Sequence, residues 1–272
     1  MTLQEKIETL EIKPTVFLIT PPQYMQKGFA GEVKQEHAKI EGIQANIINP
    51  TSNPYSNKDF FNLIHKLDGI SYGSKDMAAP KWVFTDFMYH TYTIGIGTTI
   101  EDAKNIQQEK VDKLLQEVPK GYNGIIPLSI YSAVVAPKEL FGNTLASIYH
   151  GKGLGALTKQ IGIAPWKHKK ISGFIQANNA SVKTHSKISP LQIVTPDLST
   201  IHGTPLTMKY THAFNQEIKG EQIHIPIQDK KSLATFLKQQ QIQTQNGNST
   251  TYIQPPGWQN GNVTFAVQYH NS

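Results

Sequence analysis

The segment IIPLSIYSAVV (residues 125–135) constrains the fold most, because it is an almost uninterrupted apolar run rich in strand-favouring residues. A half-exposed strand alternates apolar and polar residues, whereas a run of this kind is typical of a strand buried on both faces. The run therefore predicts a central strand of a sheet, ending at Pro137.

A glycine-rich turn and two further elements follow this strand. GLGALTKQIGI (residues 153–163) predicts a helix that Pro165 interrupts, and ISGFIQA (residues 171–177) predicts the next buried strand. Strand, turn, helix and strand in this order are typical of a βαβ-like unit.

The first part of the chain carries shorter signals. Apolar spacing predicts an amphipathic helix from Asp59 to about Gly69. Thr99 followed by Asp102 resembles a capping box and predicts one helix that ends before Pro119. Strands are predicted over 15–20 and 43–48, and a β-hairpin over 82–88 and 91–97.

The last part of the chain is dominated by strand signals. Strands are predicted over 191–194, 204–212, 221–227, 250–253 and 262–270. A short helix is predicted over 231–239. The glutamine-rich segment 239–250 forms either a loop or an extension of that helix.

The basic and sulfur-containing residues exclude several chemistries. All 26 basic residues are lysine, and the chain has no cysteine and no arginine. Disulfides, thiolate nucleophiles, cysteine-ligated metals and bidentate guanidinium clamps are therefore excluded. The histidines are scattered and no HExxH motif occurs, so we expect no metal site. No apolar run is long enough to span a membrane and no secretory signal is evident, so we expect a cytoplasmic chain without a membrane partner.

The positive charge is concentrated in one window. The formal net charge is +6, yet no Asp or Glu lies between Leu140 and Pro196, where the chain has seven lysines. The rest of the chain is close to neutral. Such a window favours a polyanionic ligand, or it is a solvated lysine-rich surface.

The glycine-rich turn at residues 150–155, His-Gly-Lys-Gly-Leu-Gly, lies within this window and precedes the predicted helix. Glycines let a backbone turn tightly, and the N–H groups of a helix's first turn attract anions. The turn fits neither the P-loop pattern nor the full GxGxxG pattern.

This turn resembles the pyrophosphate loop of the GNAT acetyltransferase superfamily, in which Gln or Arg is followed after two residues by Gly, any residue, and Gly or Ala. His150 stands at the Gln/Arg position, and Gly153 and Gly155 at the glycine positions. Downstream, Asn178, Ser181, His185 and Lys187 are similar to the family's Asn, small residue, Tyr and Lys. The resemblance extends over about residues 80–212.

The resemblance implies an α+β fold with a mixed, mainly antiparallel central sheet flanked by helices. It divides the chain into an N-terminal region (1–79), a GNAT-like core (80–212) and a β-rich C-terminal extension (213–272). It also implies a co-substrate, acetyl-CoA or another acyl-CoA, whose acyl group passes directly to an amine of a small-molecule or peptide acceptor. The implied cofactor-binding residues are Val134, Val135, Ala136, His150, Gly151, Lys152, Gly153, Leu154, Gly155 and Lys159.

The implied catalytic residues are His185 and Asn178. His185 stands at the position of the family's Tyr, which protonates the departing thiolate, and an imidazolium can do this near neutral pH. The alternative for His185 is a surface position on a helix, and for Asn178 a turn at the end of a strand. The general base is Asp86, Glu139 or a water molecule. Lys159 is one of several lysines that could reach the 3′-phosphate of CoA.

Two other functions compete with this interpretation. The lysine window, with Tyr149 and Trp166 stacking on bases, would suit a nucleic-acid-binding protein of strong salt sensitivity. Gly-Ile-Ser-Tyr-Gly around Ser71 matches the GxSxG elbow of serine hydrolases. That elbow requires a strand before it and a helix after it, and here a helix is predicted before it.

Overall fold

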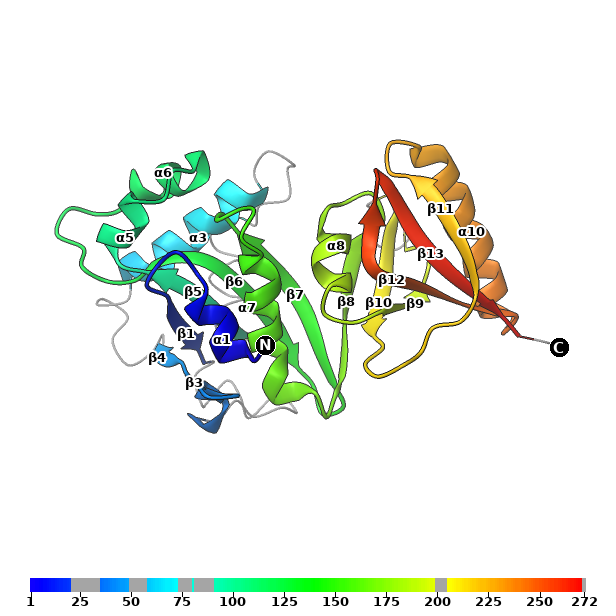
Figure 1. Cartoon of the computed structure of the whole chain (residues 1–272), viewed down its shortest axis with the longest axis horizontal. Coiled ribbons are helices and arrows are strands. Elements are labelled where there is room, and N and C mark those ends of the chain that lie inside the picture. Colours follow the sequence, from blue (N-terminus) through cyan, green and yellow to red (C-terminus); the bar gives the residue numbers. More distant parts are fainter. Residues whose placement is uncertain (21–34, 49–57, 73–79, 81–90, 199–204, 271–272) are drawn as a thin grey trace. The chain divides into compact units, whose positions relative to one another are not determined.

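The computed structural model describes residues 1–20, 35–48, 58–72, 80, 91–198 and 205–270. The chain forms two compact units, unit 1 (residues 1–169) and unit 2 (residues 170–272) (Figure 1). Each unit contains strands and helices, and each is described by itself.

The sheet of unit 1 has the strand order β7-β6-β5-β1-β4, and its neighbours are antiparallel except for β1 and β4. Strand β6, which lies between β7 and β5, contains the apolar run, and nine of its ten residues are buried. The strands are β1 (Thr15–Ile19), β4 (Asn46–Ile48), β5 (Tyr92–Thr98), β6 (Ile126–Val135) and β7 (Glu139–Ser147); β2 (Lys39–Ile40) and β3 (Ile43–Gln44) form a separate hairpin.

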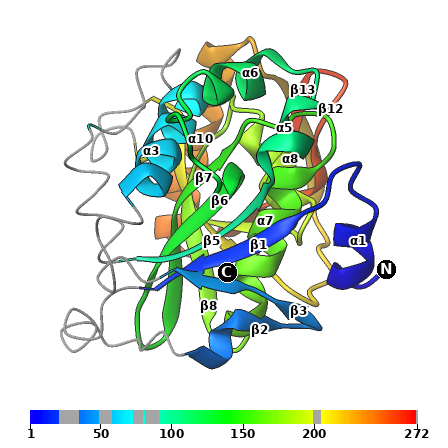
Figure 2. The same ribbon diagram turned by 90° about the vertical axis from the view of Figure 1, so that its left-hand side faces the viewer.

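Helices cover both faces of this sheet (Figure 2). Gly162 of α7 lies against Ile94 and Tyr131, which are paired across β5 and β6 and share one face. Phe17, paired with the next β5 residue, contacts Phe60 of α3 on the other face. The helices of unit 1 are α1 (Leu3–Glu8), α3 (Lys58–Tyr72), α5 (Ile100–Lys104), α6 (Glu109–Leu115) and α7 (Leu154–Ile163), with 3₁₀ turns η1 (Gln35–Ala38) and η3 (Ala164–Trp166).

Unit 2 is an antiparallel sheet of strand order β8-β10-β9-β12-β13-β11. Helices α8 and α10 share one apolar core on one face, where Phe236 of α10 contacts Phe265 of β13. The elements are β8 (Lys170–Gln176), α8 (Ser181–Ser186), β9 (Leu191–Thr195), β10 (Thr207–His212), β11 (Glu221–Pro226), α10 (Lys230–Gln245), β12 (Ser249–Gln259) and β13 (Asn262–Tyr269).

The predicted fold class is confirmed at the level of an α+β protein with mainly antiparallel sheet and several helices. The central strand, the helix after the glycine turn and the strand after Pro165 are present as β6, α7 and β8. The glutamine-rich segment extends α10 as far as Gln245. Residues 82–88 of the predicted hairpin lie outside the described residues, and residues 92–98 form β5.

Three sequence predictions were wrong or incomplete. The predicted helix between Thr99 and Pro119 is broken into α5 and α6, because Gln108 between them is extended. Residues 43–48 form two short strands rather than one. Strand β7, which pairs with β6 along its whole length, was not predicted. In the described ranges, no helix is long and apolar enough to cross a membrane.

The predicted boundaries at residues 79/80 and 212/213 do not coincide with the division after Lys169. Strands on both sides of residue 212 pair within the sheet of unit 2, since β12 lies beside β9. The assignment of residues 213–272 as a β-rich extension of a GNAT-like core stays a prediction.

We expect Gly162→Ala to destabilise unit 1 by about 1–3 kcal/mol, the usual cost of overpacking a core. A Cβ there would lie 2.5 Å from Tyr131 Cδ1 and 2.6 Å from Ile94 Cγ2. Urea unfolding followed by circular dichroism measures the loss. Gly69→Ala in α3 is the matched control, since its Cβ meets no described atom within 4 Å and the change should stabilise the helix by up to about 1 kcal/mol. Equal stability of the two variants would contradict the proposed packing.

Candidate functional site

The glycine turn joins β7 to α7 and is open to solvent. Gly151 and Gly153 have φ of +81° and +70°, and a Cβ at either position would meet no described atom within 4 Å. Gly153 is the N-cap of α7 in the left-handed conformation. Residues with a side chain adopt this conformation at a cost, so the sequence places glycine where the backbone requires it.

The N-terminus of α7 presents uncapped backbone donors. The first α-helical hydrogen bond runs from Leu157 N to Gly153 O at 3.0 Å, and no side chain caps the helix. The N–H groups of Leu154, Gly155 and Ala156 therefore point out of the first turn with the positive end of the helix dipole. This is the stereochemistry that a bound anion requires.

The backbone of His150 anchors the turn to the linker between α5 and α6. The Gln108 side chain accepts from His150 N at 2.8 Å and donates to His150 O at 3.0 Å. The break between α5 and α6 thus supplies an amide that holds the turn in place. His150 is largely exposed, and the loss of part of the hydration of its ring lowers its pKa, with a smaller contribution from the charge of Lys110.

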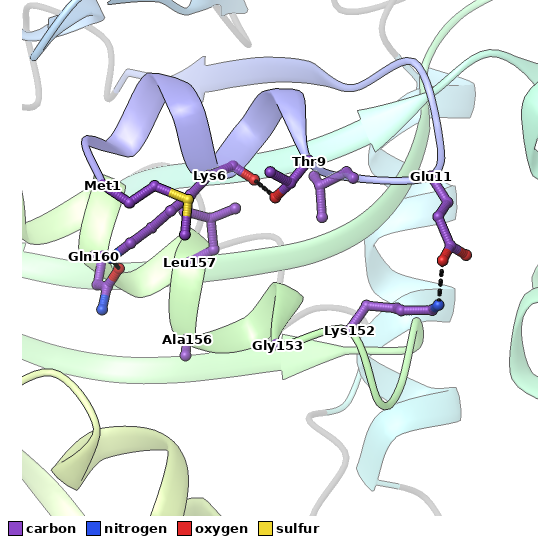
Figure 3. A pocket seen from close by; sticks show the side chains of 10 residues that line it. Met1, Lys6, Thr9, Glu11, Lys152, Gly153, Ala156, Leu157 and Gln160 are labelled. Carbon is purple, nitrogen blue, oxygen red and sulfur yellow. Dashed lines mark hydrogen bonds and ion pairs between the residues drawn. The ribbon is translucent and has the colours of Figure 1, made fainter.

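A pocket of about 250 Å³ opens beside the turn, between α1 and α7 (Figure 3). Lys152 and Gly153 line one end, where Lys152 Nζ lies 2.6 Å from Glu11 Oε1. The hydrogen bond with Glu11 raises the pKa of Lys152. Lys6 Nζ lies at the other end, 3.0 Å from Gln160 Oε1. We call this cavity the α1–α7 pocket.

The lysines of this window differ in their surroundings. Lys167 is paired with Glu41 at 2.8 Å, and Lys169 Nζ donates to the carbonyls of Ala136 and Pro137 at 2.8 and 2.7 Å. Lys170, Lys183 and Lys187 belong to unit 2 and are exposed. Of the seven lysines, Lys152 is the one that lines the α1–α7 pocket.

Lys159 does not lie where a contact with the 3′-phosphate of CoA, its predicted role, would require it. Its side chain is only 1% exposed, and its Nζ lies 5.9 Å from the centroid of the Tyr131 ring. Burial lowers its pKa well below the ordinary lysine value. A residue in this position packs α7 against the sheet rather than reaching a ligand at the surface.

Val134, Val135 and Ala136 lie at the end of β6, inside the sheet. Val134 and Val135 are paired with Phe141 and Leu140 of β7. Ala136 N donates to Glu139 O at 2.8 Å, and its carbonyl accepts from Lys169.

Asn178 and His185 belong to unit 2 and not to the unit that contains the glycine turn. Asn178 is half-buried in the turn between β8 and α8, and the neighbouring Asn179 accepts from Ser181 N at 3.0 Å. His185 is 7% exposed, so it is not a surface residue, and its Nδ1 lies 3.2 Å from Tyr210 Oη.

Sequence reasoning missed the polar groups around His185. Burial raises the pKa of Tyr210, so its hydroxyl stays protonated. Beyond Tyr210, Ser189 Oγ lies 2.7 Å from His212 Nδ1, and the rings of Tyr210 and His212 meet edge to face. Tyr210 and His212 are two residues apart on β10, a spacing that predicts that both side chains face the same side of the sheet.

The two competing functions lack the geometry they need at their key residues. Tyr149 and Trp166, the expected base-stacking residues, are only 5% and 3% exposed. Ser71 lies in the last turn of α3 with its Oγ buried, not between a strand and a helix. Neither arrangement favours nucleic-acid binding or a serine nucleophile.

No group of three or more His, Asp or Glu side chains within the described ranges is placed to hold a metal ion. Comparison with known proteins assigns the chain to no family. No protein-family model matches it, and a search of curated proteins found no significant match.

We expect Lys159→Met to stabilise unit 1 at pH 7 and to flatten the pH dependence of its stability below the ordinary lysine pKa of about 10.4. The folded pKa of Lys159 lies below the unfolded value, so between these two pKa values the unfolded chain binds the extra proton and wild-type stability rises with pH. Urea unfolding at several pH values measures the difference between the two proteins. Lys152→Met, at an exposed lysine, is the control and should not remove this rise; a rise retained in Lys159→Met would refute the assignment.

Proposed function

We propose that this protein binds an acyl-CoA and transfers the acyl group directly to an amine of a small-molecule or peptide acceptor. The observation that carries the proposal is the open glycine turn, whose uncapped N–H groups and Lys152 flank the α1–α7 pocket. The resemblance of the segment from Val134 to Ile188 to the GNAT superfamily supplies the acyl carrier and the reaction class.

The diphosphate of the carrier is the part that this turn suits. A diphosphate needs several donors that converge without side-chain bulk, and Gly151 and Gly153 leave that space. In a chain without arginine, backbone N–H groups and lysine provide the contacts that guanidinium groups often supply. Acetyl-CoA or another acyl-CoA is thus the co-substrate.

The transfer itself needs a proton donor for the departing sulfur. The acceptor nitrogen attacks the thioester carbonyl, the carbon–sulfur bond breaks, and the thiolate takes a proton from a general acid while the product nitrogen loses one to a base. The resemblance implies His185 as that general acid. Tyr210 Oη beside Nδ1 holds the His185 ring in place. Direct transfer requires no enzyme nucleophile, which agrees with a chain that has no cysteine.

We expect acetyl-CoA to raise the melting temperature of the protein, and dephospho-CoA to raise it less. Release of the CoA thiol, followed with a thiol reagent in the presence of mixed polyamines and lysine peptides, measures turnover. The chain contributes no thiol of its own to this signal. Absence of any effect of acetyl-CoA on melting would end the proposal.

We expect His185→Phe to lower turnover by about a hundredfold or more while leaving acetyl-CoA affinity within about twofold, because loss of a general acid affects the reaction and not the diphosphate contacts. Isothermal titration calorimetry measures the affinity. His224→Phe, an exposed histidine of the same unit, is the matched control and should be as active as wild type. Unchanged turnover in His185→Phe would remove His185 from the mechanism.

A further inference from the structure

Unit 2 contains one arrangement of elements twice. In its described residues, a strand, a helix and two strands occur first as β8, α8, β9 and β10, and again as β11, α10, β12 and β13 (Figure 1). In each half the last strand lies between the other two, and the halves meet where β9 pairs antiparallel with β12. An approximate two-fold axis therefore relates the first half to the second.

The strand registers show which residues of the two halves correspond. The pairing of β10 with β9 shifts directly before Tyr210, and the pairing of β13 with β12 shifts directly before Phe265. Tyr210 thus corresponds to Phe265. Two residues further along each strand and on the same face, His212 corresponds to Val267.

This correspondence separates what the fold requires from what it does not. Val267 and Phe265 belong to the apolar core of unit 2, so the second half fills these positions with hydrocarbon alone. His212 is only 6% exposed, and a buried imidazole needs hydrogen-bond partners that a valine does not need. Residues that depart from the packing pattern of a fold are the ones expected at functional sites.

The partner of His212 is a serine hydroxyl. Ser189 Oγ lies 2.7 Å from His212 Nδ1, within the reach of a nucleophile and its general base. The same hydroxyl lies 3.1 Å from the carbonyl oxygen of Pro190, and the shorter distance favours the imidazole as the acceptor of its proton. Ala213 N donates to Pro190 O at 2.8 Å, so a main-chain bond holds the two segments together.

Aromatic rings hold the His212 ring in its plane. Phe214 stacks on it at 5.3 Å between ring centroids and 18° between planes, and Tyr210 meets it edge to face at 5.5 Å. A general base must be held in one orientation toward the proton that it accepts. These rings supply that constraint for Nδ1.

The second half contains a serine at the same position, and its surroundings differ. Ser189 and Ser249 each lie four residues before the isoleucine that pairs with Tyr210 and Phe265, respectively. Ser249 Oγ donates to Gln240 Oε1 at 3.2 Å. A carboxamide oxygen does not take up a proton near neutral pH, whereas an imidazole does. Of these two serines, Ser189 is therefore the one beside a base.

The pair lies at one end of the sheet of unit 2. Ser189 belongs to the connection between α8 and β9, and His212 is the last residue of β10. Nucleophiles held on a connection by a rigid scaffold are a common arrangement in enzymes. Ser189 is 7% exposed, so the opening toward it favours a small acyl group.

We propose that Ser189 is a nucleophile toward carboxylic esters of small acyl groups, with His212 as its general base. Oγ attacks the ester carbonyl carbon while Nδ1 takes the hydroxyl proton; the carbon–oxygen bond to the alcohol breaks, and the imidazolium returns the proton to the departing alkoxide. Water then attacks the acyl-serine in the same way, which releases the acid and restores the hydroxyl. This activity goes beyond the proposed acyl transfer, because it uses neither an acyl-CoA nor the glycine turn.

The test treats the intact chain with a fluorophosphonate and locates the adduct by mass spectrometry of peptides. We expect one adduct on Ser189, lost in Ser189→Ala, and slow hydrolysis of 4-nitrophenyl acetate that is lost with it. The labelling rate should rise between pH 5 and 8 as the imidazole, with an ordinary pKa of about 6.5, loses its proton. A hydroxyl with a purely structural role would show neither the adduct nor this pH profile.

The matched variants come from the other half of unit 2. His212→Val places there the residue that the second half carries, and it should lower the labelling rate about a hundredfold or more and remove the rise with pH. Ser249→Ala should label like wild type. Circular dichroism checks the fold of each variant, and if His212→Val does not fold, the wild-type pH profile and Ser189→Ala decide. An unlabelled wild-type chain, an adduct at another residue, or equal labelling of folded His212→Val would overturn the proposal.

Discussion

The packing of α7 on β5 and β6 is the constraint on which the candidate site depends. Gly162 allows the helix to approach Ile94 and Tyr131 closely, and Lys159 inserts its side chain between helix and sheet. Because the helix is held along its length, its N-terminus and the turn before it have a defined direction. The donors of the first turn are thereby preorganised for an anion and need no ordering when one binds.

The site combines few charges with many backbone groups. In many anion sites an arginine supplies both charge and geometry, and this chain has none. In the anion site that we propose, backbone N–H groups supply geometry and lysine supplies charge. Such a division makes the site sensitive to the position of α1, because Lys6 reaches the pocket only while α1 stays packed on α7.

Sequence patterns sufficed for the elements whose signals are local. The apolar run of β6, the glycines before α7 and the cap at Thr99 each act on their own neighbours. Strand β7 was not predicted because only Leu140 and Ala146 of its nine residues are buried, so it has no apolar run of its own, and it is held by pairing with β6. The buried state of Lys159 and the polar contacts of His185 likewise depend on elements distant in sequence, which no spacing rule reveals.

The clamp between Gln108 and His150 involves only the main chain of the latter. Position 150 is therefore free to vary during divergence without displacing the turn, with proline as the exception because it lacks the donated N–H. Position 108 has no such freedom, since its carboxamide must both donate and accept. In related sequences we therefore expect residue 150 to vary and residue 108 to stay glutamine.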